Sequence, residues 1–189
     1  MITNEPIPEL IGEKELTGVR LKDGEEVPAR ILGVGIGIAP ELKLLKDAGV
    51  EVKKGVLANE YLETNLEDVY TAGDIAEFED VGAGRQWIVG NWMSAVMQGR
   101  VVAKTMAGER TKFELVSSYS ANLLGLQVVS IGDTSRKHVD DVEQLVLEDD
   151  AAVEVFHKGG RTVGAVLIGD TSRRAAITKA IKDKEEYAS

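Results

Sequence analysis

The feature that most constrains the fold is the pattern of the last third of the chain. Short apolar stretches separated by glycine-rich or acidic turns occur at residues 128–131, 142–147, 153–157 and 162–168. Their length and their β-branched residues predict four strands, with turns at 148–150 and 158–161. A helix is predicted at 171–184, with Asp170 as its N-cap. The residues expected to face inward from it are Ala176, Ile177, Ala180 and Ile181. Strands followed by one covering helix indicate an antiparallel α+β domain.

The part of the chain before Gly108 has a different pattern. Residues 16–21 and 27–38 flank an Asp-Gly turn, which predicts a hairpin with a buried strand at 31–36. The sequence further predicts a short helix from Pro40 to Gly49, a strand at 69–72 and a loop at 77–90.

The clearest helix signal follows Asn91, a good N-cap, and continues to Gly108. The residues expected to face inward are Ala95, Val96, Gly99, Val102, Ala103 and Met106. Those expected on the other side are Gln98, Arg100 and Lys104.

Composition narrows the class of protein. The 189 residues include 22 Lys and Arg and 32 Asp and Glu, so the formal net charge is −10. An acidic balance disfavours nucleic acid and anionic membranes as partners, because both need a basic face. The chain has no cysteine, which excludes a disulfide framework or a thiolate metal site within these residues. With no long apolar run either, we expect a soluble, cytoplasmic protein without a membrane partner.

A candidate ligand site lies at Gly73-Asp74. The pair ends the expected strand at 69–72, and the carboxyl ends of strands form the ligand crevice of open α/β sheets. Gly73 lacks a Cβ, so a ligand can approach the backbone closely. Asp74 can accept hydrogen bonds from sugar-like hydroxyls, or it can simply cap the next turn. The local pattern favours neither interpretation.

The wider sequence resembles a known family. Residues 55–76 resemble the second flavin motif of the FAD-dependent pyridine nucleotide-disulfide oxidoreductases. Residues 18–40 resemble the end of that family's NAD(P)H domain, and residues 92–100 are similar to its helix that points at the isoalloxazine ring. The resemblance covers nearly the whole chain, and Gly73-Asp74 is its most specific element.

The resemblance implies an α/β fold, with a partial FAD/NAD(P)-binding, Rossmann-like region followed by a small α+β C-terminal domain. It also implies FAD and NAD(P)H as cofactors. Asp74 would hold the ribityl hydroxyls of FAD, and Gly73 would give the clearance. Asn91, Trp92 and Met93 would place helix N–H groups near the flavin pyrimidine carbonyl, where a positive helix end stabilises negative charge. No residue of the chain is assigned a catalytic or metal-binding role.

The last part of the chain indicates a subgroup. Residues 120–133 and 164–171 resemble the segment after the FAD domain in NADH:rubredoxin reductases and NAD(P)H-nitrite reductase large subunits. Such enzymes pass electrons from NAD(P)H through FAD to rubredoxin, ferredoxin or a nitrite-reductase centre. The alternatives are an enzyme like NADH oxidase or CoA-disulfide reductase, and a non-catalytic dimerisation module.

The family's two glycine-rich nucleotide motifs have no counterpart here. Residues 33–37 are rich in glycine, but their spacing is wrong and they lie in an expected strand. We therefore expect the C-terminal part of a longer enzyme, inactive by itself. Its expected parts are a remnant of the NAD(P)H-binding domain at 1–40, the C-terminal part of the FAD-binding domain at 41–108, and an α+β dimerisation domain at 109–189. A homodimer through the last part and an electron-carrier protein are the expected partners.

Other polar and aromatic residues carry weaker signals. His138 and His157 lack further ligands at metal-site spacing and are expected to be ordinary surface residues. Arg173 and Arg174 are expected to form a solvated pair, with attraction of an acidic electron carrier as the alternative. Trp92 is expected either on the flavin side of its helix or in the core.

One hexapeptide occurs twice in the chain. The sequence Ile-Gly-Asp-Thr-Ser-Arg stands at residues 131–136 and again at 168–173. The repetition predicts one strand-to-helix corner used twice rather than a ligand site.

Overall fold

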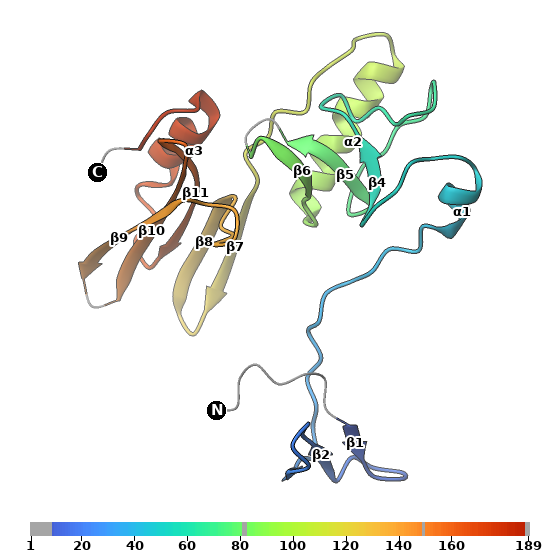
Figure 1. Ribbon diagram of the computed structural model, residues 1–189. Helices are drawn as coiled ribbons and strands as arrows, with labels where there is room; N and C mark the ends of the chain where they lie inside the picture. Colours follow the sequence, from blue (N-terminus) through green and yellow to red (C-terminus); the bar gives the residue numbers. More distant parts are fainter. Residues whose placement is uncertain (1–8, 81–82, 149, 188–189) are drawn as a thin grey trace. The chain divides into compact units, whose positions relative to one another are not determined.

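The computed structural model describes residues 9–80, 83–148 and 150–187, and the chain divides into two compact units, Met1–Ala39 and Pro40–Ser189 (Figure 1). In the first unit, strands β1 (Glu9–Ile11), β2 (Gly18–Arg20) and β3 (Glu26–Pro28) form an antiparallel sheet in that order. Arg20 holds the outer strands, because its guanidinium lies 2.6 Å from Glu9 and 2.9 Å from Glu26.

The predicted hairpin is confirmed only in its first part. β2 and β3 pair around a turn in which Gly24 has a φ of 93° and the Glu25 N–H donates to the Asp23 carboxylate. The described backbone from 29 to 42 forms neither helix nor strand, so the buried strand predicted at 31–36 is wrong. Ile31 is 91% exposed. A β propensity produces a strand only where a neighbouring strand supplies hydrogen bonds and packing.

The second unit begins with helix α1 (Lys43–Asp47), followed by a three-stranded sheet. Its strands are β4 (Val56–Ala58), β5 (Ala76–Asp80) and β6 (Arg85–Ile88), with β4 parallel and β6 antiparallel to the central β5. Leu62, Phe78 and Phe113 are the largest buried residues of this core. The two phenylalanine rings meet edge to face, with centroids 5.1 Å apart.

Two predictions for this region are wrong. Of residues 69–72 only Tyr70 pairs, in an isolated bridge with Glu63, and the loop expected at 77–90 contains β5 and β6. Strand β5 was not predicted because three of its five residues are acidic, and acidic residues are uncommon in strands. Glu77 is nevertheless buried, because its carboxylate accepts hydrogen bonds from the N–H groups of Lys54 and Gly55, both at 2.9 Å.

Helix α2 (Trp92–Met106) is confirmed, and so is its N-cap, because the Asn91 side chain accepts the Ser94 N–H. The predicted orientation of the helix is only partly right, because Val102 packs on the core and Arg100 and Lys104 are exposed as expected, but the most buried face is a different one. Its buried residues are Ser94, Gln98 and Thr105, whereas Gly99, Ala103 and Met106 are exposed. The buried polar side chains are hydrogen-bonded, so burying them carries a small penalty.

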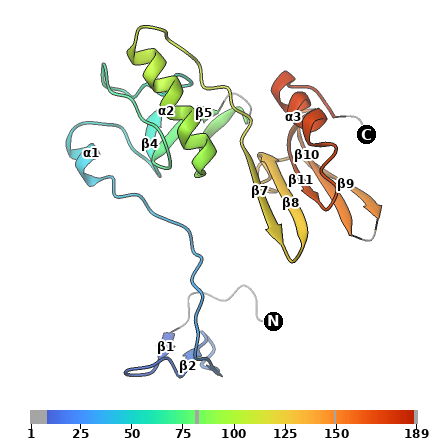
Figure 2. The same ribbon diagram turned by 180° about the vertical axis from the view of Figure 1, so that it is seen from behind.

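The C-terminal domain is the predicted antiparallel α+β fold (Figure 2). Its five strands lie in the order β7-β8-β11-β10-β9. Their bounds are β7 Ser118–Leu123, β8 Leu126–Gly132, β9 Asp141–Glu148, β10 Ala151–Lys158 and β11 Arg161–Ile168. Helix α3 (Arg174–Asp183) packs on β11 and β8, and Ile177 and Ile181 enter the core.

The structure corrects several details of this domain. β7 has no counterpart among the predicted strands, and the turn predicted at 148–150 includes Asp149, which lies outside the described residues. Asp170 does not cap α3, because Arg173 occupies the N-cap position, and Ala176 is exposed. Asp170 instead accepts the N–H of Ser172, which belongs to the turn before the helix.

The repeated hexapeptide forms the same turn twice. Gly132 and Gly169 have φ values of 62° and 73°, and each following aspartate accepts an N–H two residues further on. The second copy ends at Arg173, the N-cap of α3, and so leads into a helix as predicted, whereas the first copy is followed by a turn and β9. The environments differ, because Asp133 is buried and pairs with Arg85 at 2.7 Å, while Asp170 is exposed.

Candidate functional site

The Gly73-Asp74 pair lies beside the chain that enters α2. Gly73 has a φ of 85°, a conformation that favours glycine. A Cβ on Gly90 would lie 3.8 Å from the Asp74 carboxylate carbon. Gly90 immediately precedes the cap Asn91, so the structure brings the exposed Asp74 carboxylate close to the start of the helix.

The first turn of α2 has backbone N–H groups that donate no hydrogen bond within the helix. Asn91 caps the Ser94 N–H at 2.8 Å, and the N–H groups of Trp92 and Met93 have no intrahelical acceptor by helix geometry. The first turn contains no acidic residue that would neutralise the positive end of the helix dipole. Trp92 is 76% exposed, which rules out the alternative that it fills the core and leaves the flavin side of the helix as a prediction.

Gln98 lies on the buried face of α2, contrary to the prediction from helical periodicity. It was expected on the solvent side of α2, but it is fully buried, and its Oε1 accepts the Gly73 N–H at 2.6 Å. Its Nε2 donates to Ser94 Oγ at 3.1 Å. The available signal was the i, i+4 spacing of Ser94 and Gln98, which places two polar side chains on one face of the helix, within hydrogen-bonding reach of each other.

The loop that leads to Gly73 is held by a charged pair. The Arg110 guanidinium donates two hydrogen bonds to Glu63, both at 2.7 Å, and stacks 3.6 Å above the Tyr61 ring. Asn59 Nδ2 donates to the same carboxylate at 2.8 Å. These hydrogen bonds, that from Arg110 above all, lower the pKa of Glu63 from 4.5 to about 2.

The chemical character of the site fits FAD. Asp74 offers carboxylate oxygens, which accept hydrogen bonds from hydroxyl groups such as those of a ribityl chain. The open helix N–H groups donate to carbonyl or phosphate oxygens. Gly90 keeps a side chain away from the Asp74 carboxylate, and a Cβ on Gly73 would lie 3.8 Å from the Ala95 Cβ of α2, so the backbone between the two groups is left accessible to a ligand.

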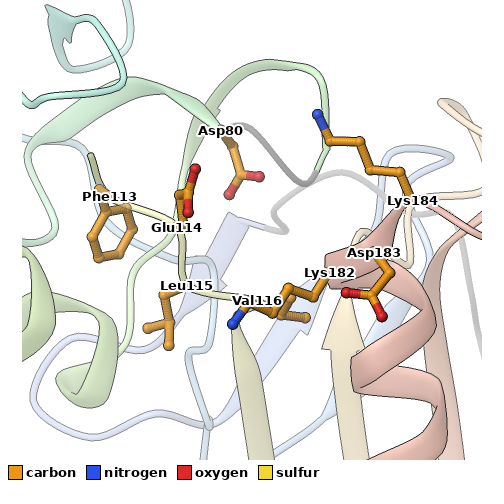
Figure 3. A pocket seen from close by; sticks show the side chains of 8 residues that line it. All are labelled: Asp80, Phe113, Glu114, Leu115, Val116, Lys182, Asp183 and Lys184. Atoms are coloured by element: carbon orange, nitrogen blue, oxygen red, sulfur yellow. The ribbon is translucent and has the colours of Figure 1, made fainter. Parts of the chain in front are cut away.

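A separate cavity of about 190 Å³ lies between the linker that follows α2 and the end of α3 (Figure 3). Phe113 and Leu115 line it from the linker, and Lys182 and Lys184 from the helix end. Asp80 also lines it, and its carboxylate accepts the Ala83 N–H at 2.7 Å. None of the residues predicted to bind the cofactor lines this cavity.

The remaining candidates are engaged within the chain. Arg173 donates to the Tyr187 hydroxyl at 3.1 Å and Arg174 to Ser118 Oγ at 3.0 Å, so they are not simply a solvated pair. His157 is not a surface residue, because its side chain is largely buried, 3.7 Å from Glu143. Within the described ranges, no group of three or more His, Cys, Asp or Glu side chains is arranged to hold a metal ion.

Comparisons with known proteins agree with this fold and show the family. Residues 1–99 match the family described as pyridine nucleotide-disulphide oxidoreductase, and the chain belongs to this family. Residues 120–185 match the rubredoxin NAD+ reductase C-terminal domain. The family's enzymes use FAD and NAD(P)H.

Two curated relatives extend the comparison. The nitrite reductase [NAD(P)H] of Bacillus subtilis is 30% identical over 95% of this chain and 22% of its own length. The NADH-rubredoxin oxidoreductase of Clostridium acetobutylicum is 28% identical over 87% of this chain and 42% of its own length. The chain therefore spans less than half the length of these relatives.

A solved structure shows the same fold. The ferredoxin reductase of the CYP199A2 system from Rhodopseudomonas palustris superposes with a TM-score of 0.86 and 22% identity, covering 97% of this chain and 46% of that one.

Among the helices of the described residues, none is both long enough and apolar enough to span a membrane.

Proposed function

We propose that this chain is the C-terminal part of an FAD-dependent oxidoreductase that passes electrons from NAD(P)H through FAD to a small electron carrier. The observation that carries the proposal is the Gly73 turn, hydrogen-bonded through Gln98 to α2 and placing Asp74 beside the open N-terminus of that helix. Family membership and the two curated relatives support the same activity.

Each site residue has a role in this proposal. Asp74 accepts hydrogen bonds from the ribityl hydroxyls, and Gly73 leaves room for them. The N–H groups of Trp92 and Met93 donate to the pyrimidine carbonyl, and Asn91 holds the first helical turn in place. When bound, FAD would supply the chemistry that accepts a hydride from NAD(P)H and passes its two electrons on, while the protein orients it and tunes its charge.

The proposal also assigns each part of the chain to a domain, and it names an electron acceptor and a cellular compartment. Residues 1–40 belong to the NAD(P)H-binding domain, 41–108 to the FAD-binding domain and 109–189 to a dimerisation domain. The match of residues 120–185 to the C-terminal domain of rubredoxin reductases supports a rubredoxin or ferredoxin as the electron acceptor. The lack of cysteine fits a reducing compartment, and we propose the cytoplasm.

Replacing Asp74 tests the flavin site. In the complete FAD-binding enzyme, Asp74→Ala removes a charged hydrogen-bond acceptor worth roughly 1.5–3 kcal/mol, so FAD affinity should fall by about 10- to 150-fold. Flavin fluorescence on titration measures the change. Glu67→Ala, which removes an exposed carboxylate from the preceding loop, is the matched control and should bind FAD normally. Normal flavin retention by the Asp74 variant would refute the assignment.

The proposed homodimer rests on the edge of the C-terminal sheet. β7 is an edge strand without charged residues, and its Tyr119 is 62% exposed. Uncharged edge strands readily pair with a second chain. Light scattering of the full chain should therefore give a dimer mass, and Tyr119→Lys should shift it toward the monomer. A wild-type chain that stays monomeric at high concentration would contradict the proposal.

A further inference from the structure

Gln98 is a buried polar side chain at the point where the Gly73 turn meets α2. It lies in the second turn of the helix and has no exposed surface. Its amide uses both ends, because Oε1 accepts the Gly73 N–H at 2.6 Å and Nε2 donates to Ser94 Oγ at 3.1 Å. The side chain therefore connects the turn that precedes Asp74 to the first turn of the helix.

The hydrogen bonds continue beyond Ser94. The Ser94 N–H donates to Asn91 Oδ1 at 2.8 Å, and Asn91 Nδ2 donates to Ser117 Oγ at 3.1 Å. A single chain of bonds thus runs from Gly73 through the helix start to the linker before β7. Buried polar networks in which each member has a partner hold their elements in one arrangement.

We propose that Gln98 is a positioning residue for FAD, which fixes the Asp74 turn relative to the N-terminus of α2. The inference rests on the proposed function, in which these two groups hold different parts of the flavin. An amide suits the position because one end accepts from the Gly73 backbone while the other donates to Ser94. A hydrocarbon side chain would leave the Gly73 N–H without its acceptor.

Two substitutions in the FAD-loaded enzyme test the proposal. Gln98→Leu removes both hydrogen bonds, and the FAD dissociation constant should rise by roughly 5- to 150-fold. Gln98→Glu keeps an acceptor for the Gly73 N–H and can accept from the Ser94 hydroxyl, so it should restore much of the binding. Its added negative charge should also shift the flavin midpoint potential to more negative values, because reduction adds negative charge to the same region.

The matched control is Thr105→Val. Thr105 is buried on the same face of α2, and its Oγ accepts the Thr111 N–H at 3.3 Å, away from the Gly73 turn. The variant should lose thermal stability but keep the wild-type dissociation constant and midpoint potential. It therefore separates the general cost of losing a buried hydrogen bond from an effect on flavin position.

The outcomes are distinct. Wild-type FAD affinity in Gln98→Leu, with a stability loss like that of Thr105→Val, would overturn the proposal. If Gln98→Leu does not fold, the midpoint potential of Gln98→Glu decides, and an unchanged potential overturns the proposal. Failure of the wild-type enzyme to hold FAD would instead refute the proposed function, and this inference with it.

Discussion

At the scale of single residues, local chemistry was predictable where a side chain acts on its own backbone. The capping role of Asn91 follows from its residue type and its place before an apolar helix, and the structure confirms it. The burial of Gln98 was not predictable from helical periodicity, because its partner Gly73 lies 25 residues earlier in the sequence. A tertiary hydrogen bond made a polar side chain suitable for the core.

The Glu63–Arg110 pair predicts a specific dependence of stability on pH. The folded pKa of Glu63, about 2, is below its ordinary value of 4.5, so its stabilising effect is complete above 4.5 and is lost as the pH falls toward 2. Wild type and Glu63→Gln should therefore differ in free energy of unfolding at neutral pH and converge near pH 2. Urea unfolding at a series of pH values measures this difference.

The control for this prediction is Glu109→Gln. Glu109 pairs with Lys104 at 3.2 Å, with both side chains more than half exposed. Exposed pairs of this kind contribute little, because water and salt screen them. The unfolding curves of Glu109→Gln should therefore follow those of wild type at every pH. A Glu63→Gln difference that stays constant down to pH 2 would show that the carboxylate charge is not responsible.

At the scale of elements, strands with apolar alternation and glycine turns were predictable, and β7 was not. Its sequence, Ser-Tyr-Ser-Ala-Asn-Leu, has little apolar character, and a Leu-Gly pair forms the turn to β8. Leu124 and Gly125 both have positive φ, at 53° and 88°, as a type I′ hairpin turn requires. Leucine rarely adopts this conformation, so the sequence carries no hairpin signal at this point.

The same turn predicts a stabilising substitution. Leu124 is fully exposed in a left-handed conformation that costs a side chain of its type about 1–2 kcal/mol, whereas asparagine tolerates it. Leu124→Asn should therefore raise the free energy of unfolding by about 1 kcal/mol. Thermal unfolding by calorimetry measures the effect. Leu123→Asn, an exchange in the adjacent strand, should not stabilise, and equal effects at both positions would point to lost surface hydrophobicity instead.

At the scale of the whole molecule, the family resemblance predicted what local pattern did not. Periodicity alone placed a buried strand at 31–36 and a loop over β5 and β6, and both predictions are wrong. The order of flavin motif, helix and C-terminal domain nevertheless agrees with the family matches, in which residues 1–99 match the pyridine nucleotide-disulphide oxidoreductases and residues 120–185 match the rubredoxin NAD+ reductase C-terminal domain. Long-range order of motifs reflects the fold, whereas the state of a short segment depends on neighbours that its own sequence does not encode.

The last prediction also concerns the whole molecule: this polypeptide by itself should not bind FAD tightly. Flavin and nicotinamide dinucleotides are held largely through their pyrophosphate, at a glycine-rich turn before a helix. Residues 1–189 contain no G-x-G-x-x-G sequence, and the site offers one carboxylate, Asp74, and one helix end. Two such contacts contribute a few kcal/mol, against an association cost of at least about 4 kcal/mol, so the dissociation constant should exceed roughly 1 mM. Titrating FAD into the isolated chain and following flavin fluorescence tests this, with Asp74→Ala as a control that should give the same curve. Stoichiometric binding in the micromolar range, lost in the control, would show that Asp74 and α2 suffice to hold the cofactor.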